Sequence, residues 1–195
     1  APDRSKKGGR AGFKKEKATT TGYMLFKRFN RSISKTSPGV ASQNRPSIIF
    51  RLADFYLIYA EVANEVNPSD SRVLTYLNLV RERAGLPKVE ILNPGIVGNK
   101  ELQRAAIQRE RQIELATEGQ RYFDVRRWMI ADKDGEGRQN GYAHGMNVRG
   151  TINDTEEFNR VVETEKIVFN RKMYLQPIPD HEMRKTQNLV QNPGW

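Results

Sequence analysis

The sequence contains no cysteine, which excludes disulfide bridges, thiolate zinc sites and a cysteine nucleophile. Only two histidines are present, His144 and His181, and neither has the spacing of a metal site or a catalytic triad. No apolar run approaches the roughly 20 residues of a membrane-spanning helix, and residues 1–17 have no apolar signal segment. A glycine-rich phosphate loop is also missing. The sequence therefore lacks the common motifs for cysteine, histidine and phosphate-loop chemistry.

The net charge of +10 comes from one part of the chain. Residues 1–50 contain twelve Lys/Arg and two Asp/Glu, whereas residues 51–195 contain 21 basic and 21 acidic residues. Nucleic-acid-binding domains usually carry their excess charge on a folded face. We therefore expect a basic flexible flank over residues 1–20 and no nucleic-acid partner. The alternative is a salt-sensitive nucleic-acid contact through this flank.

Residues 51–84 have the pattern of a helical hairpin. Apolar residues recur at helical spacing over 51–66, Asn67-Pro68 ends that segment, and a second helix is expected from Ser69 or Asp70 to about Ala84. Gly85 followed by Pro87 is a typical helix stop. The pair spans about 35 residues, which is the size of one tetratricopeptide-like unit.

The rest of the chain has fewer regular elements. We predict a third helix over 100–117, a short fourth helix over 121–130, and a glycine-rich loop over 132–150. Residues 156–168 fit a short helix or a strand, and the C-terminus is extended. The predicted fold class is mainly α, with tetratricopeptide-like helix pairs, long irregular loops and little strand.

The densest cluster of charges lies in residues 109–127. Glu110, Glu114 and Glu118 are four residues apart, so on a continuous helix their carboxylates stack on one face. Two carboxylates at such a separation would suit a retaining glycosidase that uses Glu110 and Glu114. The neighbouring arginines favour ionised carboxylates, which is wrong for a general acid. We expect Arg–carboxylate pairs that hold helices together instead.

Binding residues are sought among exposed aromatic and polar side chains. A sugar ring has apolar C–H faces that stack on aromatic rings, and its hydroxyls need polar partners. Tyr142, between Asn140 and His144 in the predicted loop, fits this description, and Tyr23 in the segment before the helices fits it less well. A second pattern, 132–137, imitates the start of a calcium loop, but Ala143 occupies the position of the bidentate glutamate. Calcium binding there stays open.

Four segments, in this order, resemble the SusD/RagB family. They are RLADFYLIYAE (51–61), LNLVRERAGLP (77–87), ERQIELATEGQRYFDVRRW (110–128), and YLQPIP (174–179) with a terminal QNPGW (191–195). The resemblance covers residues 21–195, which we take as the C-terminal helical domain of such a protein. Together with the charge cluster, it implies that the charged motif residues form a scaffold ion-pair network. Its members are Arg51, Glu61, Arg81, Arg83, Glu110, Arg111, Glu114, Glu118, Arg121, Asp124 and Arg127.

The resemblance also implies a function in ligand binding, with no enzyme activity, no catalytic residue, no metal and no cofactor. Family members are outer-membrane lipoproteins of Bacteroidetes-type bacteria that capture glycans on the extracellular face and deliver them to a SusC-like TonB-dependent transporter. Membrane attachment would then require an N-terminal lipid that is absent from this sequence. The expected partners are a glycan and the transporter. The alternative is a docking domain that contacts the transporter and binds no sugar, and the identity of the glycan or other nutrient is open.

Overall fold

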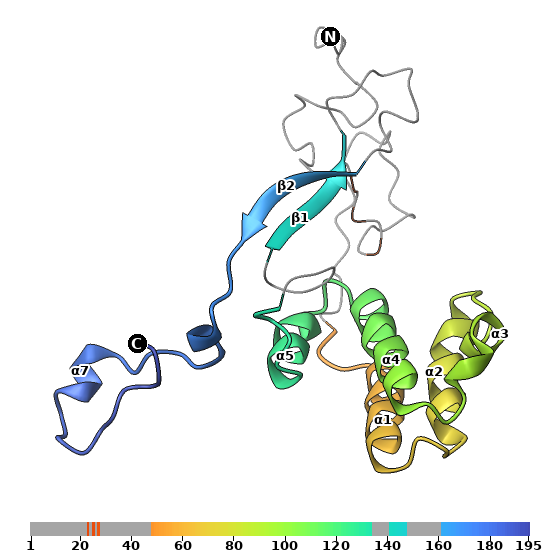
Figure 1. Ribbon diagram of the computed structural model, residues 1–195, viewed down its shortest axis with the longest axis horizontal. Coiled ribbons are helices and arrows are strands. Elements are labelled where there is room, and N and C mark those ends of the chain that lie inside the picture. Colours follow the sequence, from red (N-terminus) through yellow and green to blue (C-terminus); the bar gives the residue numbers. More distant parts are fainter. Residues whose placement is uncertain (1–22, 24, 26, 28–47, 134–140, 148–160) are drawn as a thin grey trace, which may run out of the picture. The chain divides into compact units, whose positions relative to one another are not determined.

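The computed structural model describes residues 23, 25, 27, 48–133, 141–147 and 161–195 (Figure 1). The chain divides into two compact units. The first comprises residues 45–128 and contains most of the helices, and the second contains residues 129–195. The predicted flank over residues 1–20 lies outside the described residues.

The first two helices form the predicted hairpin. α1 spans Leu52–Val66 and α2 spans Arg72–Arg83. The stop after α2 is a Schellman motif: Gly85 is left-handed at φ +78°, Leu86 N–H donates to the Arg81 carbonyl at 2.9 Å, and Gly85 N–H donates to Glu82. The prediction of a helix pair that ends at Gly85 is therefore confirmed.

Two short helices and two longer ones complete this unit. α3 spans Val89–Leu92, the 3-10 helix η1 spans Pro94–Ile96, α4 spans Lys100–Glu114 and α5 spans Gln120–Arg127. Asn99 caps α4 by accepting a hydrogen bond from Leu102 N–H. α4 ends at Glu114, earlier than the predicted Thr117. Leu115 is its C-cap, and Thr117, in the turn that follows, is left-handed at φ 69°. Met129, also left-handed at φ 53°, follows α5.

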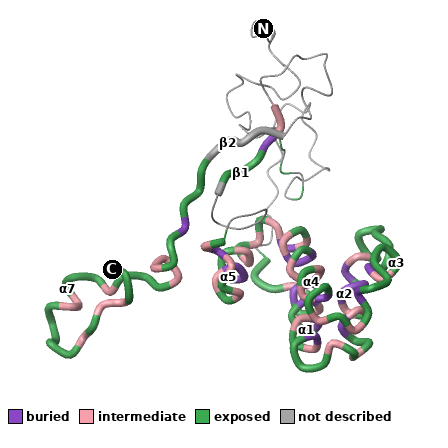
Figure 2. The backbone as a smooth tube through the Cα atoms, viewed as in Figure 1, coloured by how far each residue is buried: buried purple, intermediate pink, exposed green. Residues whose placement is uncertain are grey.

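The core of this unit lies between α1, α2 and α4. Leu57, Leu77 and Ile107 contribute one fully buried side chain from each helix. Figure 2 shows buried positions along all three helices. Burying such a side chain contributes about 1.5–3 kcal/mol. Val89 of α3 and Ile96 of η1 are also buried and belong to the same core cluster. The complete cluster of buried residues is Ala53, Leu57, Ala60, Val73, Leu77, Val80, Val89, Ile96 and Ile107.

The second unit contains an antiparallel hairpin of β1 (Gly141–Met146) and β2 (Val161–Ile167). The strand alternative for residues 156–168 is confirmed, whereas the prediction of loop throughout 132–150 is wrong over 141–146. The register shifts once, because Ala143 pairs with Glu165 but His144 pairs with Glu163. Glycines weaken the local strand signal in β1. Its strand conformation comes from backbone pairing with β2, a partner distant in the sequence.

The C-terminal segment is held by side chains that bond to the backbone. It includes η2 (Arg171–Tyr174) and α7 (Asp180–Met183). The Gln191 carboxamide accepts from Ile178 N–H at 2.8 Å and donates to the Ile178 carbonyl at 2.9 Å. Trp195 Nε1–H donates to the Lys172 and Leu175 carbonyls, each at 3.0 Å. These bonds join segment 174–179 to segment 191–195, two motifs that the sequence displays together.

None of the described helices is long and apolar enough to cross a bilayer. Among the described residues, helices predominate and one short hairpin is the only sheet. The predicted mainly α fold is therefore confirmed.

Candidate functional site

The candidate ligand residues of β1 lie on an exposed face of the hairpin. Tyr142 and His144 are two residues apart on one strand, which directs both side chains to the same side. Both are exposed, and Tyr142 retains 49% of its surface. Lys166 pairs with Tyr142 across the strands, and its Nζ lies 5.9 Å from the centre of the tyrosine ring. The hairpin thus combines an aromatic face, an imidazole and an ammonium group.

The other two ligand candidates are less informative. Tyr23 is described and exposed, at 52% of its surface. Asn140 lies outside the described residues, although it immediately precedes β1. The arrangement of Tyr142 and His144 suits stacking on an apolar ring face with hydrogen bonds at its edge.

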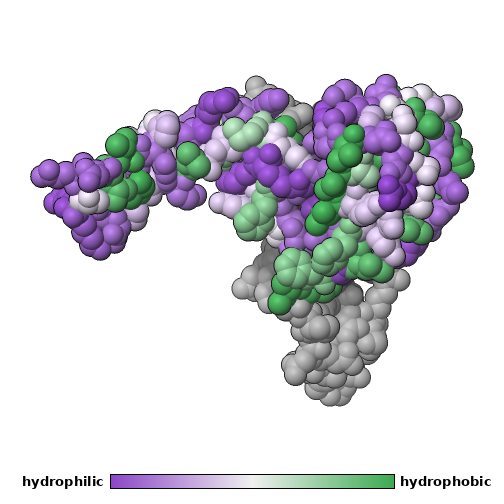
Figure 3. All heavy atoms as spheres, turned by 90° about the horizontal axis from the view of Figure 1, so that it is seen from below, coloured by the Kyte–Doolittle hydropathy of each residue, from purple (hydrophilic) through white to green (hydrophobic). Residues whose placement is uncertain are grey.

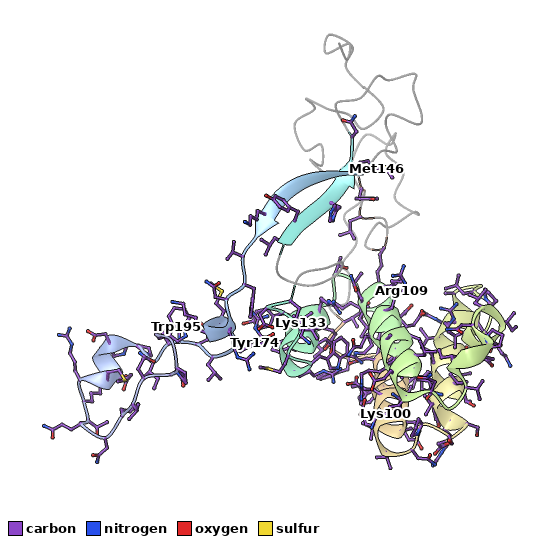
Figure 4. All side chains as sticks on the ribbon, in the orientation of Figure 1. Lys100, Arg109, Lys133, Met146, Tyr174 and Trp195 are labelled. Carbon is purple, nitrogen blue, oxygen red and sulfur yellow. The ribbon has the colours of Figure 1, made fainter. Side chains whose placement is uncertain are left out.

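The charged motif residues meet between α1, α4 and α5, where side chains crowd together (Figure 4). Arg111 lies at the centre, with only 2% of its side chain exposed. Its Nη1 donates to Asp54 Oδ1 at 2.9 Å, and its Nε and Nη2 donate to the two oxygens of Asp124 at 2.9 and 3.1 Å. The guanidinium therefore joins all three helices. Such a two-pronged Arg–carboxylate pair fixes orientation as well as distance.

A second group of contacts continues from Asp124 toward α1. Arg127 donates to Asp124 and also binds both oxygens of Glu61, the second of them at 2.7 Å. Trp128 Nε1–H donates to Glu61 Oε1 at 2.7 Å, and the Arg127 guanidinium carbon lies 4.6 Å from the centre of the indole ring. Burial, the largest single effect, lowers the pKa of Arg127, but the hydrogen bonds and charges of Glu61 and Asp124 together outweigh it and the pKa is raised.

A third group surrounds Arg51, just before α1. Its Nε donates to Glu118 at 2.7 Å, its Nη1 contacts Glu114, and its Nη2 donates to the Glu114 carbonyl at 2.6 Å. The hydrogen bond to Glu118 is the main reason that the pKa of Arg51 is raised, and Glu114 adds to it. Glu118 lies beyond the end of α4, so it does not continue the helical face of Glu110 and Glu114. The chain turns at the left-handed residue Thr117, and Glu118, which follows it, contacts Arg51.

The remaining predicted network residues are also placed by the structure. Arg81 donates to Glu110 Oε2 at 2.9 Å, and Arg83 contacts Glu114. Arg121 lies with its guanidinium carbon 5.9 Å from the centre of the Trp128 ring. Glu110 and Glu114, the pair considered for a glycosidase, each face at least one arginine. Both carboxylates are therefore engaged in ion pairs between helices, as expected for scaffold residues.

Sequence reasoning missed Asp54, a central member of the network. Asp54 is 4% exposed, and its carboxylate forms an ion pair with the Arg111 guanidinium. A usable signal was present, because Asp54 and the predicted member Glu61 are seven residues apart and therefore share one face of α1. The apolar neighbours of Asp54 along the helix concealed that signal.

No group of three His, Asp or Glu within the described part of the chain is arranged to hold a metal ion. Asp132, the first residue of the calcium-like pattern, accepts a hydrogen bond from the Tyr174 hydroxyl at 2.6 Å. That hydrogen bond lowers the pKa of Asp132. Residues 134–137 of the pattern lie outside the described residues.

Comparison with known proteins agrees with the motif order. The SusD family model matches residues 4–195. A SusD-like protein of Formosa agariphila is 44% identical over 106 residues, 54% of this chain and 19% of the relative. Another from the same organism is 31% identical over 153 residues, 76% of this chain and 26% of the relative.

Solved structures give the same result for the fold. BT4246 aligns with a TM-score of 0.62 and 34% identity, covering 78% of this chain and 24% of that one. A SusD-like protein (BF3747) of Bacteroides fragilis aligns with a TM-score of 0.61 and 31% identity, covering 76% and 26%. The chain spans between 15% and 26% of the length of the curated relatives it matches. Because the family model matches nearly all its residues, the chain belongs to the SusD family.

Proposed function

We propose that this chain is the C-terminal part of a glycan-capturing protein on the extracellular face of a bacterial outer membrane. The protein would be anchored there by lipid and would deliver its ligand to a SusC-like TonB-dependent transporter. Family membership supports this role, and the observation that carries it onto particular residues is the exposed Tyr142–His144 face of the hairpin. In this proposal the protein binds and does not catalyse.

The physical basis is the chemistry of the face. A pyranose ring presents several axial C–H bonds on one side, and these pack on a flat aromatic ring such as the Tyr142 side chain. His144 and Lys166 supply hydrogen-bond partners for ring hydroxyls beside it. The helical unit, by contrast, uses its buried charged residues on each other. We propose that this network serves as scaffold and makes no sugar contact.

Affinity electrophoresis against a panel of soluble polysaccharides tests the proposal. We expect one glycan to retard the wild-type chain and expect Tyr142→Ala to remove the retardation. Tyr122→Ala is the matched control, because Tyr122 is similarly exposed, at 44%, but belongs to α5. Retardation that survives Tyr142→Ala and is lost in the control would move the sugar site to the helical unit.

The second candidate is a docking domain that contacts the transporter without binding sugar. It is favoured by the outer side of α1, where Leu52, Phe55, Val62 and Val66 are each more than half exposed. Apolar side chains also reach the surface of the helical unit in Figure 3. Exposed patches of this kind often mark protein contacts. Co-purification with the transporter, unaffected by Tyr142→Ala and lost on Phe55→Ser/Val62→Ser, together with no glycan retardation, would favour this candidate.

A further inference from the structure

Two exposed aromatic rings of the second unit each lie beside a lysine ammonium. In the hairpin, Lys166 Nζ lies 5.9 Å from the centre of the Tyr142 ring. In the C-terminal segment, Lys172 Nζ lies 4.2 Å from the centre of the Trp195 ring. Tyr142 retains 49% of its surface and Trp195 retains 44%. An aromatic face with a positive charge beside it therefore occurs on two separate segments of this unit.

Neither ammonium is neutralised by an acidic side chain. Within the described part of the chain, Lys166 and Lys172 have no carboxylate partner. The two glutamates of β2 are opposite Ala143 and His144 in the register, whereas Lys166 is opposite Tyr142. A cation–π contact at an exposed site is weak, and the lysine stem is flexible. Each ammonium is therefore available to a negatively charged group of a ligand.

The Trp195 ring is held in place by the backbone of its own segment. Its Nε1–H donates to the carbonyls of Lys172 and Leu175, each at 3.0 Å. Both bonds come from one edge of the indole, and they fix the ring while leaving nearly half of the residue exposed. A side chain that is already ordered loses little conformational entropy when a ligand binds. Trp195 is therefore a preorganised surface for stacking.

The charge of the whole chain has the same sign as these two groups. The net charge is +10, and residues 1–50 contribute twelve Lys/Arg against two Asp/Glu. A net charge of this size attracts polymers of opposite charge over long distances and speeds their association. Long-range attraction and the two local ammoniums thus favour a ligand with negative charges.

We propose that the captured glycan is acidic and carries carboxylate or sulfate groups. This inference rests on the proposed capture function and specifies its substrate class. Lys166 and Lys172 bind the acidic groups, while Tyr142 and Trp195 stack on the sugar rings that carry them. The Trp195–Lys172 pair is a second contact, additional to the hairpin face. Charge-assisted hydrogen bonds are stronger than neutral ones, so the acidic groups give selectivity over neutral glycans.

The test measures binding of the 195-residue chain to pairs of immobilised polysaccharides by biolayer interferometry. Each pair shares one backbone: polygalacturonate with its neutral methyl ester, and dextran sulfate with dextran. Poly(dT) serves as a polyanion without glycan character. We expect at least one acidic polysaccharide to bind about tenfold more tightly than its neutral counterpart. The preference should shrink as salt is added, and the pair that shows it distinguishes carboxylate from sulfate.

Two variants and one control locate the effect. Lys166→Gln and Lys172→Gln each keep a hydrogen-bond donor but remove the charge. Each should weaken binding of the acidic polysaccharide by about fivefold and leave binding of neutral ones unchanged, and Lys166→Arg should retain the preference. Lys185→Gln removes the same charge outside both pairs, where the ammonium already contacts Glu182 at 2.6 Å, and should have no effect. Thermal melting checks the fold of each variant.

Three results would overturn the acidic substrate class. They are neutral polysaccharides that bind as tightly as their charged counterparts, a Lys185→Gln loss equal to those of Lys166→Gln and Lys172→Gln, and poly(dT) binding as tight as that of the acidic polysaccharides. The last result would indicate general attraction of polyanions, nucleic acids included. Binding of a neutral glycan through Tyr142 would leave the proposed capture function standing. Binding of no polysaccharide, charged or neutral, would refute that function and the substrate class together.

Discussion

Replacing Arg111 by methionine is expected to destabilise the helical unit severely. Arg111 and its partners Asp54 and Asp124 are all less than 5% exposed. Methionine preserves most of the volume but leaves Asp54 without a cation, whereas Asp124 keeps Arg127. Breaking a buried pair by removing one partner costs about 3–5 kcal/mol, because the remaining charge stays desolvated. That loss is a large fraction of the 5–15 kcal/mol that stabilises a typical domain.

Urea unfolding followed by circular dichroism measures this loss, provided that the m-value does not change. Arg83→Met is the matched control, because Arg83 is 60% exposed in its contact with Glu114 and should cost at most about 1 kcal/mol. The double variant Asp54→Leu/Arg111→Met should recover most of the loss, since replacing a buried pair by apolar residues is often neutral. A loss below about 1 kcal/mol for Arg111→Met alone would refute the reasoning.

Three further predictions concern local features. Thr117→Asn should stabilise the protein by about 0.5–1 kcal/mol, because asparagine tolerates the left-handed conformation at φ 69° better than a β-branched residue does; equal urea midpoints for Thr117→Asn and wild type would contradict it. Gly194→Ala should loosen the C-terminal segment, because φ is +88° and an added Cβ would lie 2.9 Å from Lys172 Cβ; faster amide hydrogen exchange at Ile178 checks this, and unchanged exchange argues against it. The hydrogen bond from Arg104 lowers the pKa of Glu65 to about 2 from 4.5, so its stabilisation is present above pH 4.5 and fades as the pH falls toward 2. Because Glu65 is exposed, Glu65→Gln should cost less than about 1 kcal/mol at pH 7. The melting temperature of this variant should approach that of the wild type as the pH falls below 4.5. A difference in melting temperature that does not change with pH would exclude the ion pair as its cause.

The helical unit was largely predictable because its signals are local. The apolar period of 51–66, the stop at Gly85 and the asparagine that caps α4 all act within one or two turns of helix. The family motifs were also visible as sequence, and they placed the charged residues in one group before any contact was known.

The hairpin was harder to predict, because strand β1 depends on a partner that lies about 20 residues further along the chain. Its glycines weaken the local preference, so the segment read as a loop although Tyr142 and His144 were already selected as binding candidates. Asp54 was overlooked for a related reason. An acidic residue in the first turn of a helix is ordinary, and only the approach of Arg111 from α4 makes it a buried ion-pair partner.

The sequence by itself thus determined the helical class and the absence of cysteine chemistry, because composition and short-range spacing carry that information. It also pointed to the family, through the resemblance of its four ordered motifs. Only the tertiary structure decided which arginine meets which carboxylate, because those partners lie up to 67 residues apart in the chain. The same holds for the hydrogen bonds by which Gln191 holds Ile178. Long-range packing sets burial, and burial decides whether a charged or polar side chain acts as scaffold or faces a ligand.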